Sequence, residues 1–349
     1  MELLNKTLSA IQEPDATSEE KALERLNSLT KPQGSLGVLE DIVVKLAGIY
    51  RTPKVVSGPK VVLVMAGDHG VVEEGVSAAL QSVTPEMVLN FLAGGAAINV
   101  FARHSGAKVV VTDVGIAAPP INDENLKHCR IRSGTGNIAK GPAMTREEAV
   151  EALEVGIRLV NEEIENGAQI IATGEMGIGN TTPSSAILAA FSKRPVEEIT
   201  GRGTGIDDKC LERKKKAIAS AIEINKPDAS DGLDVLSKVG GLEIGAMAGV
   251  MLGAAARKKP VLVDGFICGA AALIASSLSA MSKKYMIASH LSKEPGHKVM
   301  LDLLGLKPFL HMDMRLGEGT GAALTFPIIE AAIKMYNEMA TFEEAGVVM

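Results

Sequence analysis

Short, continuous apolar runs alternate with longer amphipathic stretches over most of this chain. The runs lie at 61–65, 108–112, 169–173, 260–263, 285–288 and 309–312, and a polar or glycine-rich turn follows most of them. Apolar runs of this kind are typical of strands that are buried on both faces of a parallel sheet. We therefore predict a parallel sheet built from these strands.

Helical patterns separate the predicted strands, at about 85–103, 146–165, 207–224, 242–257 and 269–281. Strands that alternate with helices predict an α/β architecture with right-handed crossovers. The chain ends differ from this pattern, because they carry helical periodicity only. We expect helices at 18–29 and 36–50, joined by the turn Lys31-Pro32-Gln33-Gly34, and a helical tail at 321–339 that packs beside them.

Composition narrows the classes of function. The net charge is −6 and aromatic residues make up 3%, so the chain lacks the basic surface and stacking rings of a nucleic-acid-binding protein. Its three cysteines form no C-x-x-C pair, which indicates a reducing, cytoplasmic setting. The first residues do not resemble a signal peptide. The longest mostly apolar stretch, 242–256, is shorter than the ~20 residues of a membrane span and contains Glu243. We expect no nucleic-acid or membrane partner.

Two glycine-rich segments are candidate phosphate sites. Ligands of open parallel sheets bind beyond the carboxyl ends of the strands, where the polar and glycine-rich segments of this chain are concentrated. Gly-Thr-Gly occurs three times, and the triplet at 203–205 leads into a helix that carries Lys214. The second candidate, 177–182, also leads into a helix. Bare glycine amides and a helix start are suited to an anion, although each turn taken alone is also compatible with a simple tight turn.

Common nucleotide-binding motifs are absent from the sequence. It contains no G-x-x-x-x-G-K-[ST] and no G-x-G-x-x-G at a strand-to-helix turn, which disfavours a P-loop ATPase and a standard dinucleotide site. It also lacks the paired acids followed by Thr-Gly-Gly-Thr of the common pyrophosphate-dependent phosphoribosyltransferases. The histidines, among them His69, His290, His297 and His311, show no recognised ligand spacing, so we expect no metal.

Two glutamates are candidate catalytic groups. Glu175 follows Gly174 just after a predicted strand, and Glu318 lies between Gly317 and Gly319. A carboxylate with glycine neighbours has little side-chain cover, so it faces either solvent or a ligand in a cleft. Their position at the carboxyl ends of strands favours a functional role.

The sequence resembles one family closely: nicotinate-nucleotide–dimethylbenzimidazole phosphoribosyltransferase. The resemblance extends almost from end to end and rests on a series of motifs in a fixed order. These are Arg25-Leu26-Asn27, Thr30 to Gly37, Ala66 to Val71, Thr173 to Thr182, Thr200 to Gly205, Val263 to Phe266, Ser289-His290 and Arg315 to Gly321.

The resemblance implies an α/β fold with a Rossmann-like three-layer parallel sheet and a smaller helical domain from the chain termini. We expect the small domain to comprise 1–55 and 321–349, and the catalytic domain to comprise 56–320. The resemblance further implies a homodimer with its active sites near the subunit interface. It implies no metal and no cofactor, with nicotinate mononucleotide and a benzimidazole base as substrates.

Site residues follow from the same resemblance. The catalytic carboxylate falls on Glu318, and a second active-site glutamate falls on Glu175. The phosphate and nucleotide are expected at Gly177, Gly179, Asn180, Thr181, Gly203, Thr204, Gly205, Lys214 and Asp264. The base is expected at Ser77, Leu80 and Gln81, where Leu80 replaces an aromatic residue found in some members.

Two other classes of function remain open at this stage. A Rossmann-like module that only binds a nucleotide would turn nothing over. A nucleosidase would use water in place of the benzimidazole and would release nicotinate without an acceptor. The complete series of motifs, Glu318 included, favours the transferase, in which one base removes the proton of the attacking azole ring.

Overall fold

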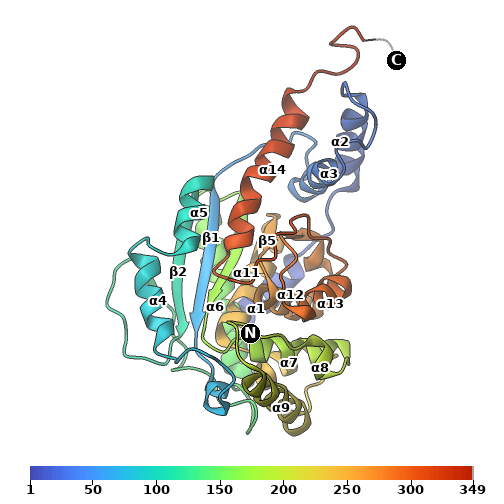
Figure 1. Cartoon of the computed structure of the whole chain (residues 1–349). Helices are drawn as coiled ribbons and strands as arrows, with labels where there is room; N and C mark the ends of the chain where they lie inside the picture. The colour runs from blue at the N-terminus through green and yellow to red at the C-terminus, as the bar shows by residue number, and fades with distance from the viewer. Residues whose placement is uncertain (348–349) are drawn as a thin grey trace.

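A parallel sheet of six strands lies between helices in the computed structural model, which describes residues 1–347 (Figure 1). The strand order is β3-β2-β1-β4-β5-β6, so the direction of strand addition reverses between β1 and β4. A crevice forms at such a switch point, beyond the carboxyl ends of the strands. The strands are β1 (Lys60–Gly67), β2 (Ala107–Gly115), β3 (Leu126–His128), β4 (Ile170–Met176), β5 (Val261–Val263) and β6 (Met286–Ala288).

Strand β1 shows why the apolar runs are continuous. Val61, Leu63 and Met65 belong to the apolar cluster on one face of the sheet, and Val62 and Val64 belong to the cluster on the other face. Because successive side chains of a strand point to opposite faces, both sets must be apolar when helices cover both faces.

Two groups of helices cover these faces. One group packs on the face of Val61 and comprises α1 (Glu2–Ala10), α6 (Arg146–Glu165), α7 (Thr181–Ser192), α8 (Val196–Ile199), α9 (Asp208–Asn225), α10 (Gly232–Val239), α11 (Leu242–Ala256), α12 (Phe266–Leu278) and α13 (Pro295–Leu304). The other group packs on the face of Val62 and comprises α2 (Ala16–Ser28), α3 (Val38–Tyr50), α4 (Val83–Leu92), α5 (Ala97–Ser105) and α14 (Thr320–Glu338). Two 3₁₀ helices, η1 (Gly70–Glu74) and η2 (Ala280–Tyr285), complete the described elements.

Helices α6 and α11 pack with their backbones in close approach. A Cβ atom added to Gly249 of α11 would overlap the carbonyl of Leu153 on α6, and one added to Gly156 would overlap the carbonyl of Ala246. Helix α11 is buried on all sides, which explains why it has no polar stripe in the sequence.

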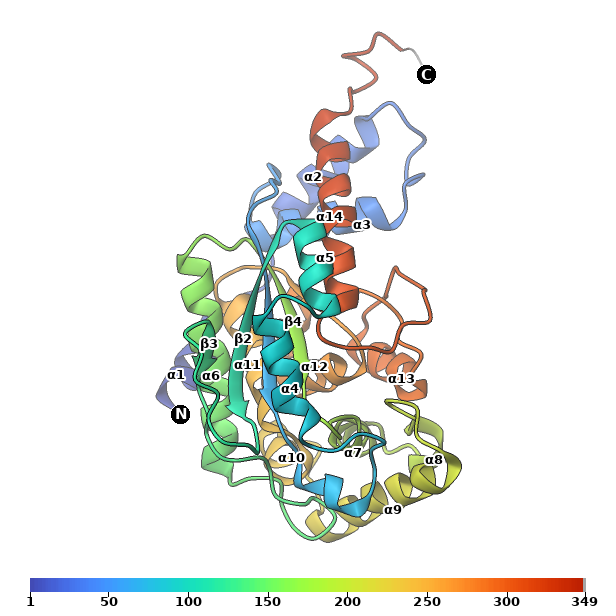
Figure 2. The same ribbon diagram turned by 60° about the vertical axis from the view of Figure 1, so that its left-hand side comes forward.

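The chain ends meet beside the sheet. Helix α14 contacts α5 and α3 (Figure 2). The guanidinium of Arg25 on α2 donates to the carbonyl of Tyr336 on α14. Helix α1 differs from our expectation for residues 1–55, because it packs against α6 and α11 on the opposite face of the sheet. The apolar side chains of α2, α3 and α14 share one cluster with the sheet, so the separate helical domain remains a proposal.

Two predicted elements need correction, and one strand was not predicted. Residues 309–312 form no strand, because only Leu310 makes a single bridge, to His290. The predicted helix at 85–103 is two helices, α4 and α5, separated by a turn in which Gly94 has a φ of +76°. Strand β3, at the edge of the sheet, was missed because Leu126 is the one apolar residue among its three, so it forms no apolar run.

One stretch, Val83–Ser105, is long and apolar enough to cross a membrane when judged by length and composition alone. It consists of α4, the turn after it and α5. Length and composition are weak grounds for a membrane span, because core helices of other proteins pass the same test.

The packing of α6 on α11 predicts a specific sensitivity. Gly249→Ala should destabilise the fold by about 1–3 kcal/mol, because the added methyl group has no space beside the Leu153 carbonyl. Gly141→Ala is the matched control, since a Cβ atom there meets nothing within 4 Å. Thermal unfolding of the two variants is the measurement, and equal melting temperatures would contradict the close approach.

Candidate active site

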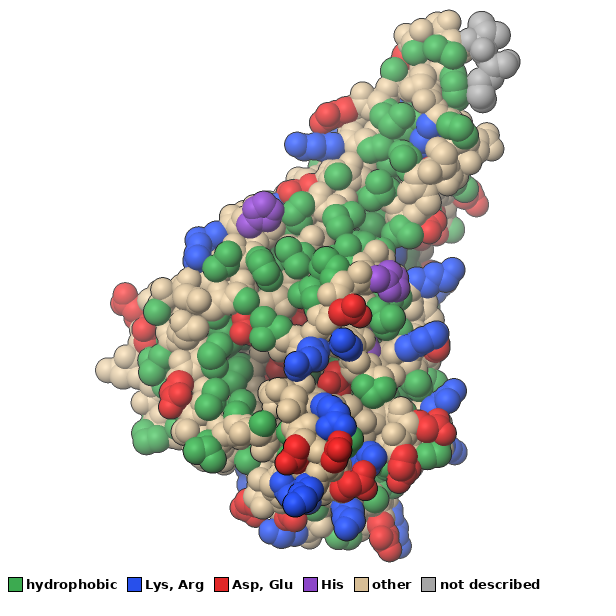
Figure 3. Space-filling model, viewed as in Figure 1, with side chains coloured by type: hydrophobic (Ala, Val, Ile, Leu, Met, Phe, Trp, Pro, Cys, Tyr) green, Lys and Arg blue, Asp and Glu red, His purple; other side chains and the backbone are tan. Residues whose placement is uncertain are grey.

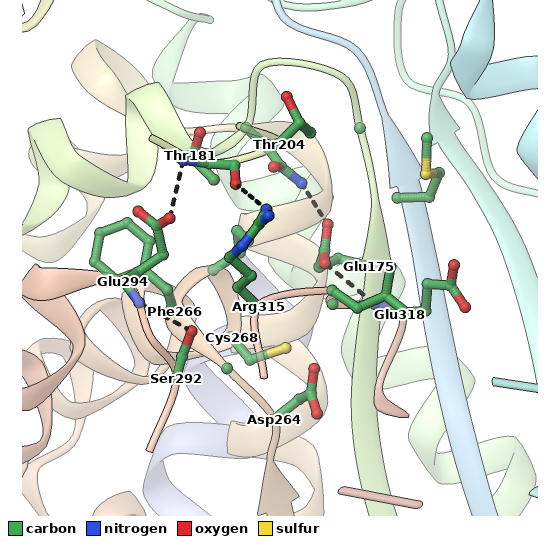
Figure 4. A pocket seen from close by; sticks show the side chains of 18 of the residues that line it. Glu175, Thr181, Thr204, Asp264, Phe266, Cys268, Ser292, Glu294, Arg315 and Glu318 are labelled. Atoms are coloured by element: carbon green, nitrogen blue, oxygen red, sulfur yellow. Dashed lines mark hydrogen bonds between the residues drawn. The ribbon is translucent and has the colours of Figure 1, made fainter. Parts of the chain in front are cut away.

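A cavity of about 270 Å³ lies beyond the carboxyl ends of β4 and β5. Six segments that are distant in the sequence build its walls: residues 79–87, the end of β4 with the start of α7, the turn before α9, the residues after β5, the residues after β6, and the loop before α14 (Figure 4). Its polar lining includes Glu175, Asn180, Thr181, Thr204, Asp264, His290, Glu294, Arg315 and Glu318. The structure thus brings both candidate glutamates and parts of both glycine-rich turns into one cavity.

Glu175 is buried in the wall of this cavity, at the end of β4. The side-chain amide of Asn180 donates to one of its carboxylate oxygens, and the backbone amide of Glu318 donates to the other at 3.3 Å. Burial raises the pKa of Glu175 to about 8, the Asn180 hydrogen bond opposes this shift, and the nearby charges of Asp264 and Glu243 add to it. At neutral pH the protonated acid therefore predominates in the unliganded protein.

Glu318 lies in a loop with three successive positive φ angles, and glycine occupies two of these positions. Gly317, Glu318 and Gly319 all have positive φ, at 95°, 63° and 91°. A Cβ atom added to Gly174 on β4 would overlap the carbonyl of Glu318, so the loop backbone lies directly on the strand.

The Glu318 carboxylate is held by the first turn of α5. Its Oε2 atom accepts a hydrogen bond of 3.1 Å from the backbone amide of Ile98, in the first turn of α5. Burial raises the pKa of Glu318, while this hydrogen bond opposes the rise. A carboxylate with a raised pKa is a stronger base than an exposed glutamate.

The first glycine-rich turn, 177–181, leads into α7. Gly179 has a φ of +90°, and within residues 1–347 the amides of Gly179 and Thr181 have no hydrogen-bond acceptor. Unpaired amides at the positive end of a helix of this length are suited to an anion.

The second turn, 203–205, is tied to the first through Lys214. The ammonium group of Lys214 donates to Thr181 Oγ1 at 2.8 Å and to the carbonyl of Gly201 at 3.1 Å. Burial lowers the pKa of Lys214 to about 8, and the charge of Glu294 opposes this shift. The charge of Glu294 therefore offsets only part of the cost of burying the Lys214 ammonium between the two turns.

Two residues at this turn were not singled out from the sequence. Arg315 donates to the carbonyl of Gly203 at 3.0 Å, and Glu294 accepts from the amide of Gly203 at 2.9 Å. Arg315 opens the motif that ends in Gly321, so the motif itself contained the signal. Glu294 follows no pattern that would distinguish it from a surface acid.

Asp264 and His290 close the cavity on the side of β5 and β6. Asp264 is buried, and its Oδ1 atom accepts from the amide of Ala322 at 2.9 Å and lies 3.9 Å from His290 Nδ1. Burial raises the pKa of Asp264, and the neighbouring His290 opposes the rise. Among the residues that the structure describes, no three His, Cys, Asp or Glu side chains are arranged to hold a metal ion.

The residues expected to bind the base lie at the edge of the cavity. Leu80 is 77% exposed and does not line it, and the side chain of Gln81 donates to the carbonyl of His69. Ser77 lines a smaller adjoining pocket. The apolar wall of the cavity comes instead from side chains that we had not identified: Ala79, Val83, Met87, Met176 and Leu316.

The fold and the site define the class: an α/β protein in which one cavity at the switch point of a parallel sheet is lined by buried carboxyl groups and two glycine-rich turns. Comparison with known proteins is more specific. The model of a family described as phosphoribosyltransferase matches residues 11–347, and the chain belongs to this family.

Similar proteins cover nearly the whole chain. A nicotinate-nucleotide–dimethylbenzimidazole phosphoribosyltransferase from Desulforamulus reducens is 63% identical over 348 residues, with 99% of each chain covered. A protein of the same name from Dehalococcoides mccartyi is 53% identical over 347 residues, with 99% of each chain covered. The crystal structure of the Thermus thermophilus enzyme of this name superposes with a TM-score of 0.91 at 43% identity, and the match covers 96% of this chain and 99% of that one.

Proposed function

We propose that the protein transfers ribose 5-phosphate from nicotinate mononucleotide to 5,6-dimethylbenzimidazole or a related base. The products are nicotinate and α-ribazole 5′-phosphate. One observation carries the proposal: a single cavity contains four buried carboxyl groups, Glu175 and Glu318 among them, and a pair of glycine turns linked by Lys214. The names of the relatives, which are up to 63% identical, agree with this reaction.

The donor phosphate is assigned to the two glycine turns. The unpaired amides of Gly179 and Thr181, the ammonium of Lys214 and the guanidinium of Arg315 supply donors and positive charge there. Binding of the phosphate at these turns holds the ribose in place. Binding energy that arises far from C1 therefore helps to orient C1 for reaction. Asp264 is assigned to the nucleotide as well.

The acceptor ring is assigned to the apolar wall formed by Ala79, Val83, Met87 and Met176. This wall adjoins Glu318, and a flat, mostly apolar ring suits it better than a sugar does. Ser77, Leu80 and Gln81 then contribute at the rim, provided that the segment moves or a second subunit covers it. Thioether side chains adapt to rings of different shape, so we expect the site to accept several bases.

The chemistry needs one base. The pyridine nitrogen of the leaving nicotinate is neutral after the bond breaks, so it needs no proton. The attacking azole ring becomes cationic unless it loses the proton on its other nitrogen. Glu318 takes that proton as attack proceeds at C1. Attack opposite the leaving group inverts C1 and converts a β-nucleotide into an α-riboside, and the two bound rings are positioned for it.

Glu175 stabilises the oxocarbenium-like sugar when it is ionised. In the unliganded protein its pKa of about 8 keeps it largely protonated at neutral pH. The pyridinium of the donor brings a positive charge into the cavity, and this charge favours the carboxylate form. Donor binding thus favours the ionised form of Glu175, and this negative charge stabilises the transition state.

Glu318→Gln should lower kcat by ~100-fold or more, the range for a lost general base, while the donor binds normally. The glutamine oxygen can still accept from Ile98, so the loop should keep its shape. Glu338→Gln, at the exposed end of α14, is the matched control. Near-normal turnover of Glu318→Gln would remove this residue from the base role.

Donor affinity should show a maximum near pH 8. Glu175 and Lys214 each have a pKa of about 8. Below this pH, protonation of Glu175 weakens binding of the cationic ring. Above it, loss of the Lys214 proton weakens binding of the phosphate. Calorimetric titration of nicotinate mononucleotide from pH 6 to 10 measures both limbs. Glu175→Gln should abolish the acidic limb and Lys214→Met the alkaline limb, and unchanged limbs would contradict the assignments.

Release of nicotinate separates this function from the alternatives. A transferase releases nicotinate only when a benzimidazole is present, a nucleosidase releases it without one, and a binding module releases none. The same assay tests the proposed function as a whole.

We also propose that the chain forms a homodimer. Large apolar side chains are exposed near the cavity and on α4 and α5, with Leu80 at 77%, Leu316 at 58%, Leu89 at 52% and Val100 at 48%. Figure 3 shows hydrophobic side chains gathered over this part of the molecule. Exposed apolar surface of this kind marks a protein interface.

Leu89→Asp should dissociate the dimer, because it places a charge in the apolar surface. Ile224→Asp on α9 is the matched control, since Ile224 is also 52% exposed. Light scattering after size exclusion measures the mass of each variant. A wild-type mass of one chain would contradict the dimer, and a dimeric Leu89→Asp would place its interface elsewhere.

A further inference from the structure

The segment Asp68-His69, directly after β1, is buried and takes no part in the reaction proposed above. Asp68 and His69 are 0% and 1% exposed. They lie behind the first glycine turn, because a Cβ atom added to Gly177 would overlap the carbonyl of Gly67 and would lie 3.4 Å from His69 Nε2. The phosphate turn therefore rests directly on the end of β1.

A chain of hydrogen bonds joins Asp68 to that turn through Thr84 of α4. The hydroxyl of Thr84 donates to Asp68 Oδ1 at 2.6 Å, and the backbone amide of Ile178 donates to Thr84 Oγ1 at 3.1 Å. Thr84 is 0% exposed, so no water competes for these bonds.

The direction of these hydrogen bonds is fixed by the chemistry of the groups. A hydroxyl has a single proton, and the carboxylate of Asp68 accepts it, so Thr84 must present a lone pair to Ile178. The second oxygen of Asp68 accepts from the amide of Ala117 at 2.8 Å, which anchors the carboxylate to the end of β2. Asp68 thus determines which way the Thr84 hydroxyl points.

A buried pair holds the same segment from below. His69 Nε2 lies 2.8 Å from Glu243 Oε1 on α11, and both side chains are fully or almost fully buried. Burial alone lowers the pKa of His69, but the charge and hydrogen bond of Glu243 outweigh it and shift the pKa upward. The segment Asp68-His69, which contacts the glycine turn, is therefore fixed to helix α11 in the core as well as to the sheet.

We infer that Thr84, oriented by Asp68, is a positioning residue for the donor phosphate. By binding the Ile178 amide on the protein side, Thr84 sets the conformation in which the amides of Gly179 and Thr181 stay unpaired for an anion. The inference rests on the proposed function, because it takes the phosphate of nicotinate mononucleotide as the ligand of this turn.

Thr84→Val tests the inference, since it removes the hydroxyl and keeps the shape of the side chain. The donor KM should rise about tenfold, the effect of one lost buried hydrogen bond, and the KM of the benzimidazole should stay within about twofold. Thr84→Ser keeps the hydroxyl and should restore the donor KM. Thr112→Val, a buried threonine of β2 whose hydroxyl has no partner within the described residues, controls for loss of a buried hydroxyl as such.

A donor without phosphate distinguishes positioning from a general loss of structure. With nicotinate riboside, Thr84→Val and wild type should have the same kcat/KM, because the turn has no phosphate to hold. Equal losses with both donors, or an unchanged donor KM for nicotinate mononucleotide, would overturn the inference. If wild type itself releases no nicotinate with an acceptor present, the proposed function fails instead.

Asp68→Asn provides a second route if Thr84→Val does not fold. The asparagine oxygen must remain at the Ala117 amide, so its NH₂ group faces Thr84 and removes the acceptor that orients the hydroxyl. The donor KM should rise here too, with the acceptor KM unchanged. An unchanged donor KM in a folded Asp68→Asn would also overturn the inference.

Discussion

The close contact between the end of β4 and the loop before α14 is the constraint on which the site depends. Gly174 leaves room for the carbonyl of Glu318, and the Glu318 amide in turn donates to the carboxylate of Glu175. Side chains at the three glycine positions 174, 317 and 319 would separate the two segments. The two candidate catalytic acids are therefore brought together by backbone geometry, and both line the cavity.

Burial gives these acids their chemical character. Glu175, Asp264 and Glu318 lie in one region of low polarity, and burial is the first cause of the raised pKa of each. The same burial lowers the pKa of Lys214 on the phosphate side. The unliganded site thus has acids whose pKa values are raised by burial, and they face a lysine whose pKa is lowered by burial. A ligand with a cationic ring at one end and a phosphate at the other favours the ionised acids with its ring and the protonated lysine with its phosphate.

Much of this could be predicted from the sequence, because parallel strands and glycine turns leave local signals. The sheet, its helices and the two glutamates followed from apolar runs and from motifs such as the one around Glu175. The apolar wall that we propose for the acceptor did not, because Val83 and Met87 are ordinary apolar residues of α4 until the fold places them in one cavity with Glu318. The run 309–312 had the composition of a strand, but only Leu310 pairs, with His290 just past the end of β6. The chain of hydrogen bonds through Thr84 could not be predicted either, since it joins three segments that meet only in the folded protein.

The central claim is that the carboxylate of Glu318 takes the proton of the attacking ring. A crystal structure with 5,6-dimethylbenzimidazole and a non-reactive analogue of nicotinate mononucleotide tests it most directly. The account predicts that a ring nitrogen of the base lies within about 2.6–3.2 Å of a Glu318 carboxylate oxygen, with the other nitrogen toward C1 of the ribose. A base whose nitrogens face solvent or Glu175, with Glu318 still bonded to Ile98 alone, would contradict it.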